Sequence, residues 1–186
     1  MYKIHKQYRL KNYDYSQYGG YFITICTKDR VEYFGNFNNG EMQVNEIGTI
    51  AEKFWNEIPD SFDGVQTDQF VVMPNHIHGI IILMKQEDNL NQQKTLDRLP
   101  ASIQPLIKNS VSSIVNHYKG KVKRWCNKND FEHFNWQARF YDHIIRNEKS
   151  LNIIREYIFY NPLKRYLEYQ KNGTFKYENI FNVRQK

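Results

Sequence analysis

The sequence has little cysteine and no long run of apolar residues. Its two cysteines, Cys26 and Cys126, are too few to build a framework of disulfide bonds, so a cytoplasmic location is the default expectation. No apolar stretch approaches the length needed to span a bilayer, and the first twenty residues are polar and rich in tyrosine, unlike a signal peptide. We therefore expect no membrane-spanning segment and no membrane partner.

The residues that are present fit one folded domain. The chain of 186 residues is 40% hydrophobic and 16% aromatic, which is enough to bury a single core. No internal repeat or break in composition requires a second domain, so we interpret residues 1–186 as one domain with its core at about 20–165. The polar, aperiodic stretch 85–98 is predicted to be a mobile connector, and 170–186 a peripheral tail.

The formal net charge of +6 favours a polyanionic partner without identifying it. Basic residues gather in three places, with tyrosine and tryptophan interleaved. One such group is more often a solvated surface than a binding site, but three groups with aromatic residues that can stack on unpaired bases favour nucleic-acid binding. The basic residues are Lys3, Lys6, Arg9 and Lys11; Lys119, Lys121, Lys123 and Arg124; and Arg139, Arg146, Arg155, Lys164 and Arg165.

The order of predicted elements indicates an α+β fold. Alternating, β-branched patterns predict strands at 20–27, 33–37, 41–44, 67–73, 76–84 and, as a longer extended segment, 134–145. Apolar residues at helical spacing predict three helices, at 47–58 ending at Pro59, at 103–118 ending at Gly120, and from the cap Asn147 to Pro162. We expect a ferredoxin-like antiparallel sheet with helices on one face and the 76–84 strand at its centre.

Residues 73–79 read Met-Pro-Asn-His-Ile-His-Gly and run directly into an apolar stretch. Alternation along a strand puts the imidazoles of His76 and His78 on one face, which we expect to face solvent, while Ile77 points into a core. Two neighbouring imidazoles on a rigid element are half of a divalent-metal site. The alternative is two ordinary exposed polar residues beside a core position. If a metal is bound, its other ligands come from elsewhere in the chain.

A second pair of polar residues lies in the third predicted helix. Tyr157 and Asn161 are four residues apart and therefore share one face, at the flank of the apolar stripe formed by Leu151, Ile154 and Ile158. A helix packed by that stripe would hold the pair at the edge of the sheet. The alternative is that the Tyr157 hydroxyl lies in water and that Asn161 is only a helix cap before proline.

Four sequence blocks, in order, resemble the single-tyrosine HUH transposases, and most closely the REP-associated tyrosine transposases. The similarity extends from about Tyr21 to Lys164. The blocks are Met-Pro-Asn-His-Ile-His-Gly at 73–79, Trp-Gln at 136–137, Tyr-Asp-His-Ile-Ile-Arg at 141–146, and Tyr-Ile-x-x-Asn-Pro at 157–162.

The resemblance implies a ferredoxin-like domain that cleaves single-stranded DNA and transfers strands at hairpin-bearing repeats, through a 5′-phosphotyrosine intermediate. Carried over residue by residue, His76, His78 and Asn161 are metal ligands and Tyr157 is the nucleophile. Two imidazoles, an amide and open positions for water and phosphate suit Mg²⁺ or Mn²⁺. Relatives act as monomers or homodimers.

Some assignments stay open at this point. Tyr160 and Tyr141 lie close enough in sequence to Tyr157 to compete as nucleophile, and Gln137, His143 and Arg146 match family blocks without a firm role. The main alternative function is a non-catalytic module that binds single-stranded nucleic acid on a ferredoxin-like sheet. Such a sheet would carry aromatic residues where this strand carries His76 and His78, which favours the enzyme. A hydrolase of small phosphoesters would leave the basic groups unexplained.

Overall fold

The structure, a computed structural model, describes residues 13–38, 41–84 and 109–172. A four-stranded antiparallel sheet has the order β4-β5-β1-β6. Its strands are β1 (Gly19–Cys26), β4 (Val65–Met73), β5 (His76–Leu83) and β6 (Tyr141–Ile145), and a separate hairpin is formed by β2 (Gly35–Asn38) and β3 (Glu41–Val44). The α+β class is confirmed, and the strand with the two histidines is central.

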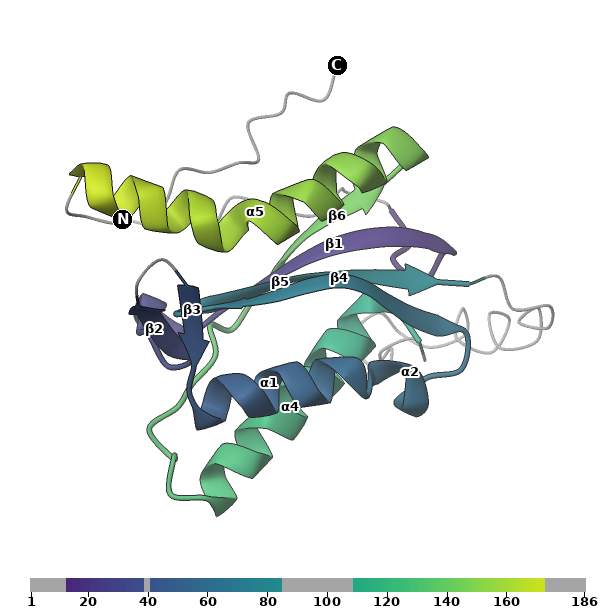
Figure 1. Cartoon of the computed structure of the whole chain (residues 1–186). Coiled ribbons are helices and arrows are strands. Elements are labelled where there is room, and N and C mark those ends of the chain that lie inside the picture. Colours follow the sequence, from purple (N-terminus) through teal and green to yellow (C-terminus); the bar gives the residue numbers. More distant parts are fainter. Residues whose placement is uncertain (1–12, 39–40, 85–108, 173–186) are drawn as a thin grey trace, which may run out of the picture.

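Helices cover both faces of this sheet. On one face lie α1 (Glu46–Asn56), the short α2 (Ile58–Ser61) and α4 (Val111–Lys128), and on the other lies α5 (Glu148–Asn172) (Figure 1). A single 3-10 turn, η1 (Lys28–Arg30), follows β1. The expectation that the helices pack on one face is therefore wrong for α5. No helix among the described residues is both long and apolar enough to cross a membrane.

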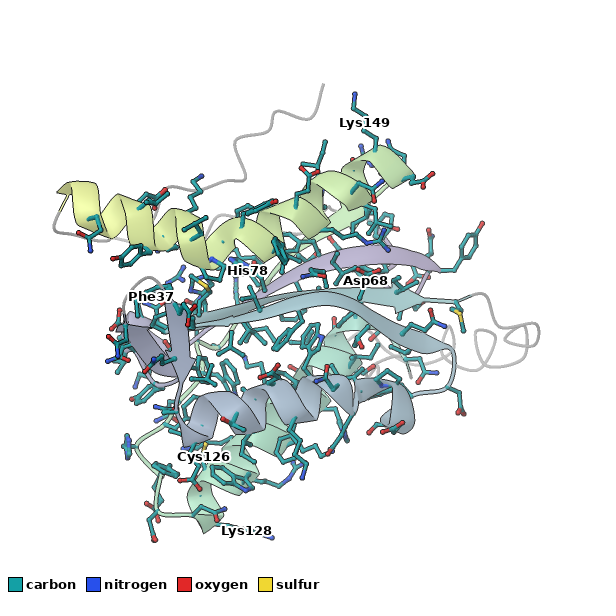
Figure 2. All side chains as sticks on the ribbon, viewed as in Figure 1. Phe37, Asp68, His78, Cys126, Lys128 and Lys149 are labelled. Atoms are coloured by element: carbon teal, nitrogen blue, oxygen red, sulfur yellow. The ribbon has the colours of Figure 1, made fainter. Side chains whose placement is uncertain are left out.

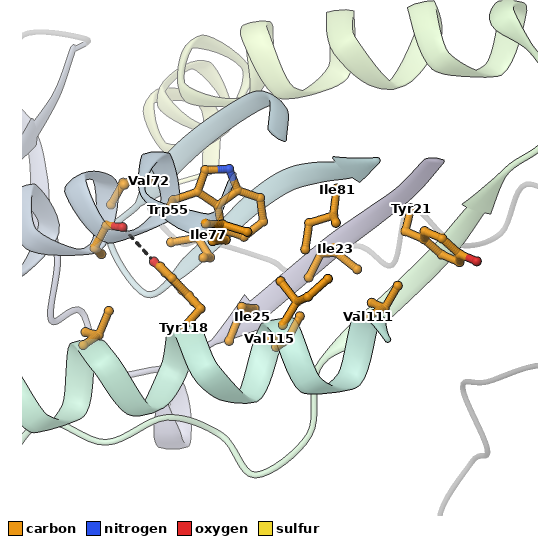
Figure 3. Packing of buried hydrophobic residues seen from close by; sticks show 14 of the residues in the cluster. Tyr21, Ile23, Ile25, Trp55, Val72, Ile77, Ile81, Val111, Val115 and Tyr118 are labelled. Carbon is orange, nitrogen blue, oxygen red and sulfur yellow. Dashed lines mark hydrogen bonds between the residues drawn. The ribbon is translucent and has the colours of Figure 1, made fainter. Parts of the chain in front are cut away.

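The main core lies between the sheet and α1 with α4. Alternate residues of β1 and β5, among them Ile23, Ile77 and Ile81, point to this side and meet Trp55 of α1 and Tyr118 of α4 (Figure 3). The buried Tyr118 hydroxyl donates to the Ala51 carbonyl oxygen at 2.9 Å, so burial leaves it satisfied. Full burial of an aliphatic side chain such as Ile23, Ile77 or Ile81 stabilises the fold by about 1.5–3 kcal/mol.

The remaining residues of β1 and β5 form a second, smaller core under α5. Phe22 and Ile80 pack against Ile158, with Leu151 and Ile154 beside them. The apolar stripe predicted for this helix is thus the face that contacts the sheet. Because both central strands are covered on both sides, the two faces of β5 are distinct environments, and the histidines share the α5 side with Ile80.

Three helix ends differ from the predictions. α1 ends at Asn56, and Pro59 lies in the first turn of α2, where its missing N–H does no harm. Gly120 lies inside α4 because the buried residues Val122 and Cys126 continue the apolar stripe beyond it. A single glycine or proline therefore predicts the end of a helix less reliably than a continuing apolar pattern predicts its extension.

Pro162 likewise lies inside α5 rather than at its end. Proline removes one backbone hydrogen bond but does not prevent the helix from resuming. Ion pairs of Glu168 with Lys164 and Arg165, spaced four and three residues apart, stabilise the turns that follow. Asn147 does cap the helix, since its Oδ1 accepts from the Ser150 N–H at 2.8 Å.

Several predictions fall partly or wholly outside the described residues. These are the connector 85–98, the basic arm at Lys3 to Lys11, the beginning of the second helix at 103–108, the hairpin tip at 39–40, and the tail from 173 onward. Of the tail, residues 170–172 belong to α5. In the segment 134–145 only Tyr141–Ile145 is a strand, while Trp136 forms one isolated bridge with Thr27.

Candidate active site

His76 and His78 open β5 and lie on the face that α5 covers (Figure 2 shows His78 beneath this helix). Their Nε2 atoms are 3.1 Å apart, while Ile77 points into the main core, as predicted. The expectation that the two rings face solvent is wrong, because His76 is only 5% exposed and His78 only 6%. The cause is α5, whose side chains close over this end of the strand.

Each imidazole is held by a partner at its other ring nitrogen. The Nδ1 of His76 is 2.8 Å from Oδ1 of Asn75, and the Nδ1 of His78 is 2.8 Å from Oγ1 of Thr24 on the neighbouring strand. Such bonds fix the orientation of a ligand ring. Sequence reasoning missed both partners. Thr24 is opposite His78 only through the strand register, which no local pattern reveals.

Tyr157 reaches this site from α5. Its hydroxyl oxygen is 3.3 Å from Nε2 of His78, and its ring packs edge-on against His78 and Phe22. Tyr157 therefore lies over the two central strands, and the expectation that it lies at the edge of the sheet is wrong. Tyr160 is 56% exposed, whereas Tyr141 lies on β6 opposite Thr24. The Tyr157 hydroxyl thus adjoins His78, while Tyr141 shares the α5 face of the sheet with Thr24 and His78.

Asn161 is one helical turn beyond Tyr157 and is 4% exposed. A hydrogen bond from its side chain to Tyr157 lowers the pKa of that hydroxyl, against the larger effect of burial. Its Oδ1 is buried and has no hydrogen-bond partner among the described residues. A buried oxygen without a partner costs about 1–3 kcal/mol, and this one lies one helical turn from the tyrosine that contacts His78, which makes it a candidate ligand for a cation.

The donor atoms fit a divalent metal. Two imidazole nitrogens bound at about 2.1 Å and at a right angle would lie about 3 Å apart, close to the separation of the two Nε2 atoms here. Across the described ranges, no group of three or more His, Cys, Asp or Glu side chains is placed to hold a metal ion. The third protein ligand would therefore be the Asn161 oxygen, a set that leaves positions for solvent or a phosphate oxygen.

Burial keeps both histidines neutral, as metal binding requires. Burial lowers the pKa of His78 to about 3, and it lowers that of His76 well below the usual 6.5, with His78 adding to the effect. Arg30 and Arg165 lower both values further through their positive charge. A neutral imidazole offers its lone pair to a cation at neutral pH.

The Tyr157 hydroxyl is protonated in this environment. Burial raises its pKa to about 12, against the smaller opposing effects of Asn161 and Arg165. Arg165 follows Asn161 by one turn, and its side chain is only 12% exposed, so Tyr157, Asn161 and Arg165 form a ladder on the inner face of α5. The site is thus apolar enough to hold the phenol neutral, while Arg30 and Arg165 add positive charge around the site.

The remaining basic residues lie in other places. On α4, across the sheet from the site, Lys121 pairs with Glu57 and Lys123 donates to the carbonyls of Glu132 and Phe134. Arg155 makes a two-point ion pair with Asp68 of β4. Of the basic residues predicted to bind DNA, those with exposed side chains are Arg124, Arg139, Arg146 and Lys164.

The two other residues from family blocks lie on segments that adjoin the site. His143 lies opposite Phe22, on the α5 side of the sheet, where burial lowers its pKa. The backbone N–H of Gln137 donates to the Cys26 carbonyl at 2.8 Å, and the Gln137 carbonyl accepts from Lys119. Gln137 therefore fixes the strand that ends beside His76.

Comparison with known proteins gives two relatives in Haemophilus influenzae. One, an uncharacterized protein, is 42% identical over 158 residues, which cover 83% of this chain and 86% of that protein. The other, named for the REP-associated tyrosine transposases, is 25% identical over 176 residues, covering 89% of this chain and 84% of its own length. No protein-family model matches the chain.

A solved structure shares the fold. A REP-associated tyrosine transposase bound to a REP hairpin matches with a TM-score of 0.56 at 17% identity, covering 90% of this chain and 88% of that one. At this identity the likeness establishes the ferredoxin-like α+β fold. Together with the named relative, it confirms the resemblance that the sequence blocks indicated.

Proposed function

We propose that this chain is a metal-dependent endonuclease and strand transferase for single-stranded DNA. The chain belongs to the same family as the Haemophilus influenzae protein that is 42% identical to it. It also resembles the REP-associated tyrosine transposases. The relatives support a transposase-like role. The single observation that supports the finer proposal most strongly is the Tyr157 hydroxyl, 3.3 Å from an imidazole that lies 3.1 Å from a second one.

His76, His78 and Asn161 would hold the metal, Mg²⁺ or Mn²⁺. When bound, the cation would stabilise the negative charge that develops on a phosphodiester under attack. Asn161 would have a second task, because its hydrogen bond with Tyr157 lowers the pKa of that hydroxyl and so favours the phenolate. Arg165 favours the same form through its charge. These two residues oppose the effect of burial, which disfavours the phenolate.

Tyr157 is the proposed nucleophile. Its Oη would attack the phosphorus of a phosphodiester and lose its proton to water, while the bond from phosphorus to the 3′-oxygen breaks and that oxygen takes up a proton. The products are a 5′-phosphotyrosine and a free 3′-hydroxyl. Because the phosphodiester energy is kept in the tyrosine ester, a different 3′-hydroxyl can reverse the step and join a new strand.

The proposed substrate is single-stranded or hairpin DNA. The solved relative is bound to a REP hairpin, and the basic surface of this chain suits a phosphate backbone. A non-catalytic sheet that binds nucleic acid needs an open face, as in modules that stack bases on their strands. Here α5 covers the face with the histidines, and that favours the enzyme over the binding module.

The experiment is cleavage of a labelled DNA hairpin with a single-stranded flank. We expect a covalent protein–DNA adduct with Mg²⁺ or Mn²⁺ and none in EDTA, and we expect His76→Ala to lose the adduct. His133→Ala, at an exposed histidine away from the site, is the matched control and should behave as wild type. Cleavage that is unchanged in EDTA would contradict the metal role.

A further inference from the structure

The side chain of Asn75 bridges His76 and the turn that carries Arg30. Asn75 is 4% exposed, its Nδ2 donates to the Arg30 carbonyl oxygen at 3.1 Å, and its Oδ1 is 2.8 Å from Nδ1 of His76. A backbone carbonyl can only accept, so the NH₂ end of the amide must face Arg30. The oxygen end therefore faces His76, and because it too can only accept, Nδ1 of His76 must carry the proton.

This assignment decides where the proton between the two imidazoles lies. With its proton on Nδ1, neutral His76 has a lone pair on Nε2, which can only accept. Nε2 of His78 is 3.1 Å away, and two facing lone pairs at that distance would repel. Nε2 of His78 therefore carries the proton, and its Nδ1 accepts from the Thr24 hydroxyl at 2.8 Å.

We propose that Asn75 is a positioning residue that holds His76 in the tautomer ready to bind a cation, and that cation binding moves the ring proton of His78 from Nε2 to Nδ1. This inference rests on the metal role proposed above. No proton is gained or lost overall, because water takes one from Nε2 and returns one to Nδ1. The Thr24 hydroxyl must then rotate from donor to acceptor.

The turn beside Asn75 explains why an amide is suited to this position. Asp29 and Arg30 both have left-handed backbone angles, with φ of 54° and 59°, which residues other than glycine seldom adopt. The amide nitrogen of Asn75 holds the Arg30 carbonyl in this turn while its oxygen holds His76. Aspartate could still accept from His76, but it could not donate to the Arg30 carbonyl. The orientation of His76 and the support of the turn can therefore be separated by mutation.

The first measurement is made on the metal-free wild-type protein. Nitrogen-15 NMR of the histidine rings near pH 7 distinguishes protonated from unprotonated ring nitrogens. We expect His76 to be protonated at Nδ1 and His78 at Nε2. A His76 protonated at Nε2, or a His78 already protonated at Nδ1, would overturn the inference. This result is independent of DNA cleavage, so it stands or falls separately from the proposed function.

The second measurement adds Mg²⁺, which is diamagnetic and leaves the spectra sharp. At saturation His78 should become protonated at Nδ1, while the tautomer of His76 should not change. A His78 that keeps its proton on Nε2 at saturating Mg²⁺, or that shows no response to Mg²⁺, would overturn the proposed proton shift. In the second case the metal role would fail too, although the metal-free tautomers would be unaffected.

Variants test the role of each partner. Asn75→Ala should give His76 a mixture of tautomers and weaken Mg²⁺ binding by about 10–100-fold, as loss of an outer partner does in metal sites. Asn75→Asp should keep the Nδ1–H tautomer of His76. Thr24→Val should weaken Mg²⁺ binding, and Thr24→Ser should restore it.

Asn129→Ala is the control, because it removes a similar amide-to-carbonyl bond at the distant end of α4. It should leave both tautomers unchanged. An Asn75→Ala protein with a wild-type His76 tautomer and wild-type Mg²⁺ affinity would contradict the positioning role.

Discussion

At the scale of single residues, the site combines burial with positive charge. His76, His78 and Tyr157 are all held in uncharged forms by desolvation, and Arg30 and Arg165 add positive charge around them. Neutral imidazoles suit a cation, and the positive surroundings suit a phosphate. In the proposed reaction, groups already held in place would need less reorganisation when metal and DNA bind.

The buried histidines predict how stability depends on pH. In the unfolded chain a histidine takes up a proton at about pH 6.5, but in the folded protein His78 does so only at about pH 3. The unfolded state therefore binds more protons between these values, and the free energy of unfolding should fall as the pH decreases from about 6.5. Urea denaturation of the metal-free protein between pH 7 and about 4.5, above the range of ordinary carboxylates, measures this slope.

A histidine variant tests the cause. His78→Asn should reduce the slope, and part of the slope should remain because burial also lowers the pKa of His76. A wild-type protein whose stability is constant from pH 7 to about 4.5 would contradict the buried, neutral assignment.

At the scale of elements, α4 shows how the apolar pattern outlasts a glycine. Gly120 lies in the middle of the helix, and an added Cβ would meet only the flexible end of Arg124 at 3.1 Å. We expect Gly120→Ala to raise the free energy of unfolding by about 0.5–1 kcal/mol, because alanine loses less backbone entropy in a helix. If the helix instead ended at Gly120 in a left-handed cap, alanine would lower the free energy of unfolding. Urea denaturation distinguishes a helix that continues through Gly120 from one that ends there.

Gly79 is the contrasting position on β5. A Cβ there would lie 2.3 Å from the ring of Trp55, which is itself buried between the sheet and α4. Gly79→Ala should therefore destabilise the protein by about 1–3 kcal/mol through overpacking. The glycine that follows the two histidines serves the packing of α1, and not the chemistry on the other face. A Gly79→Ala protein as stable as wild type would show that Trp55 can move aside.

At the scale of the whole molecule, local patterns predicted the elements better than their arrangement. Alternation placed His76 and His78 on one face and Ile77 on the other, and the spacing of Leu151, Ile154 and Ile158 identified the packed side of α5. Neither pattern indicates which face of the sheet a helix covers. The burial of the histidines under α5 follows from that long-range choice, and so it was mispredicted.

Outer partners were missed for the same reason. Thr24 is 54 positions from His78 in sequence and meets it only through the pairing of β1 with β5. Arg30 reaches the site through a turn with left-handed residues, which composition does not indicate. The four residues His76, His78, Tyr157 and Asn161 could be selected because they lie in short motifs, whereas the residues that support them are spread over the fold.

The charge distribution predicts a salt-dependent interaction with DNA. Affinity for a single-stranded hairpin flank should fall with salt, with a logarithmic slope of about 0.7 for each phosphate contact. Arg165→Gln should weaken both DNA binding and adduct formation, because Arg165 shares the inner face of α5 with Tyr157. Lys121→Gln removes the same charge from α4, on the other face, and should leave the adduct rate at saturating DNA unchanged. Equal loss of adduct rate in both variants would contradict this separation of the two faces.

The most direct test of the central proposal is the fate of one oxygen atom. Tyr157→Phe removes the hydroxyl that lies 3.3 Å from His78 and leaves the ring packed against Phe22, so the fold should be retained. Tyr160→Phe, on the exposed side of the same helix, is the matched control. With single-stranded hairpin DNA and Mn²⁺, we expect a covalent adduct from wild type and from Tyr160→Phe, mapped to the peptide that contains Tyr157, and none from Tyr157→Phe. A full yield of adduct from Tyr157→Phe would contradict the assignment of this tyrosine as the nucleophile.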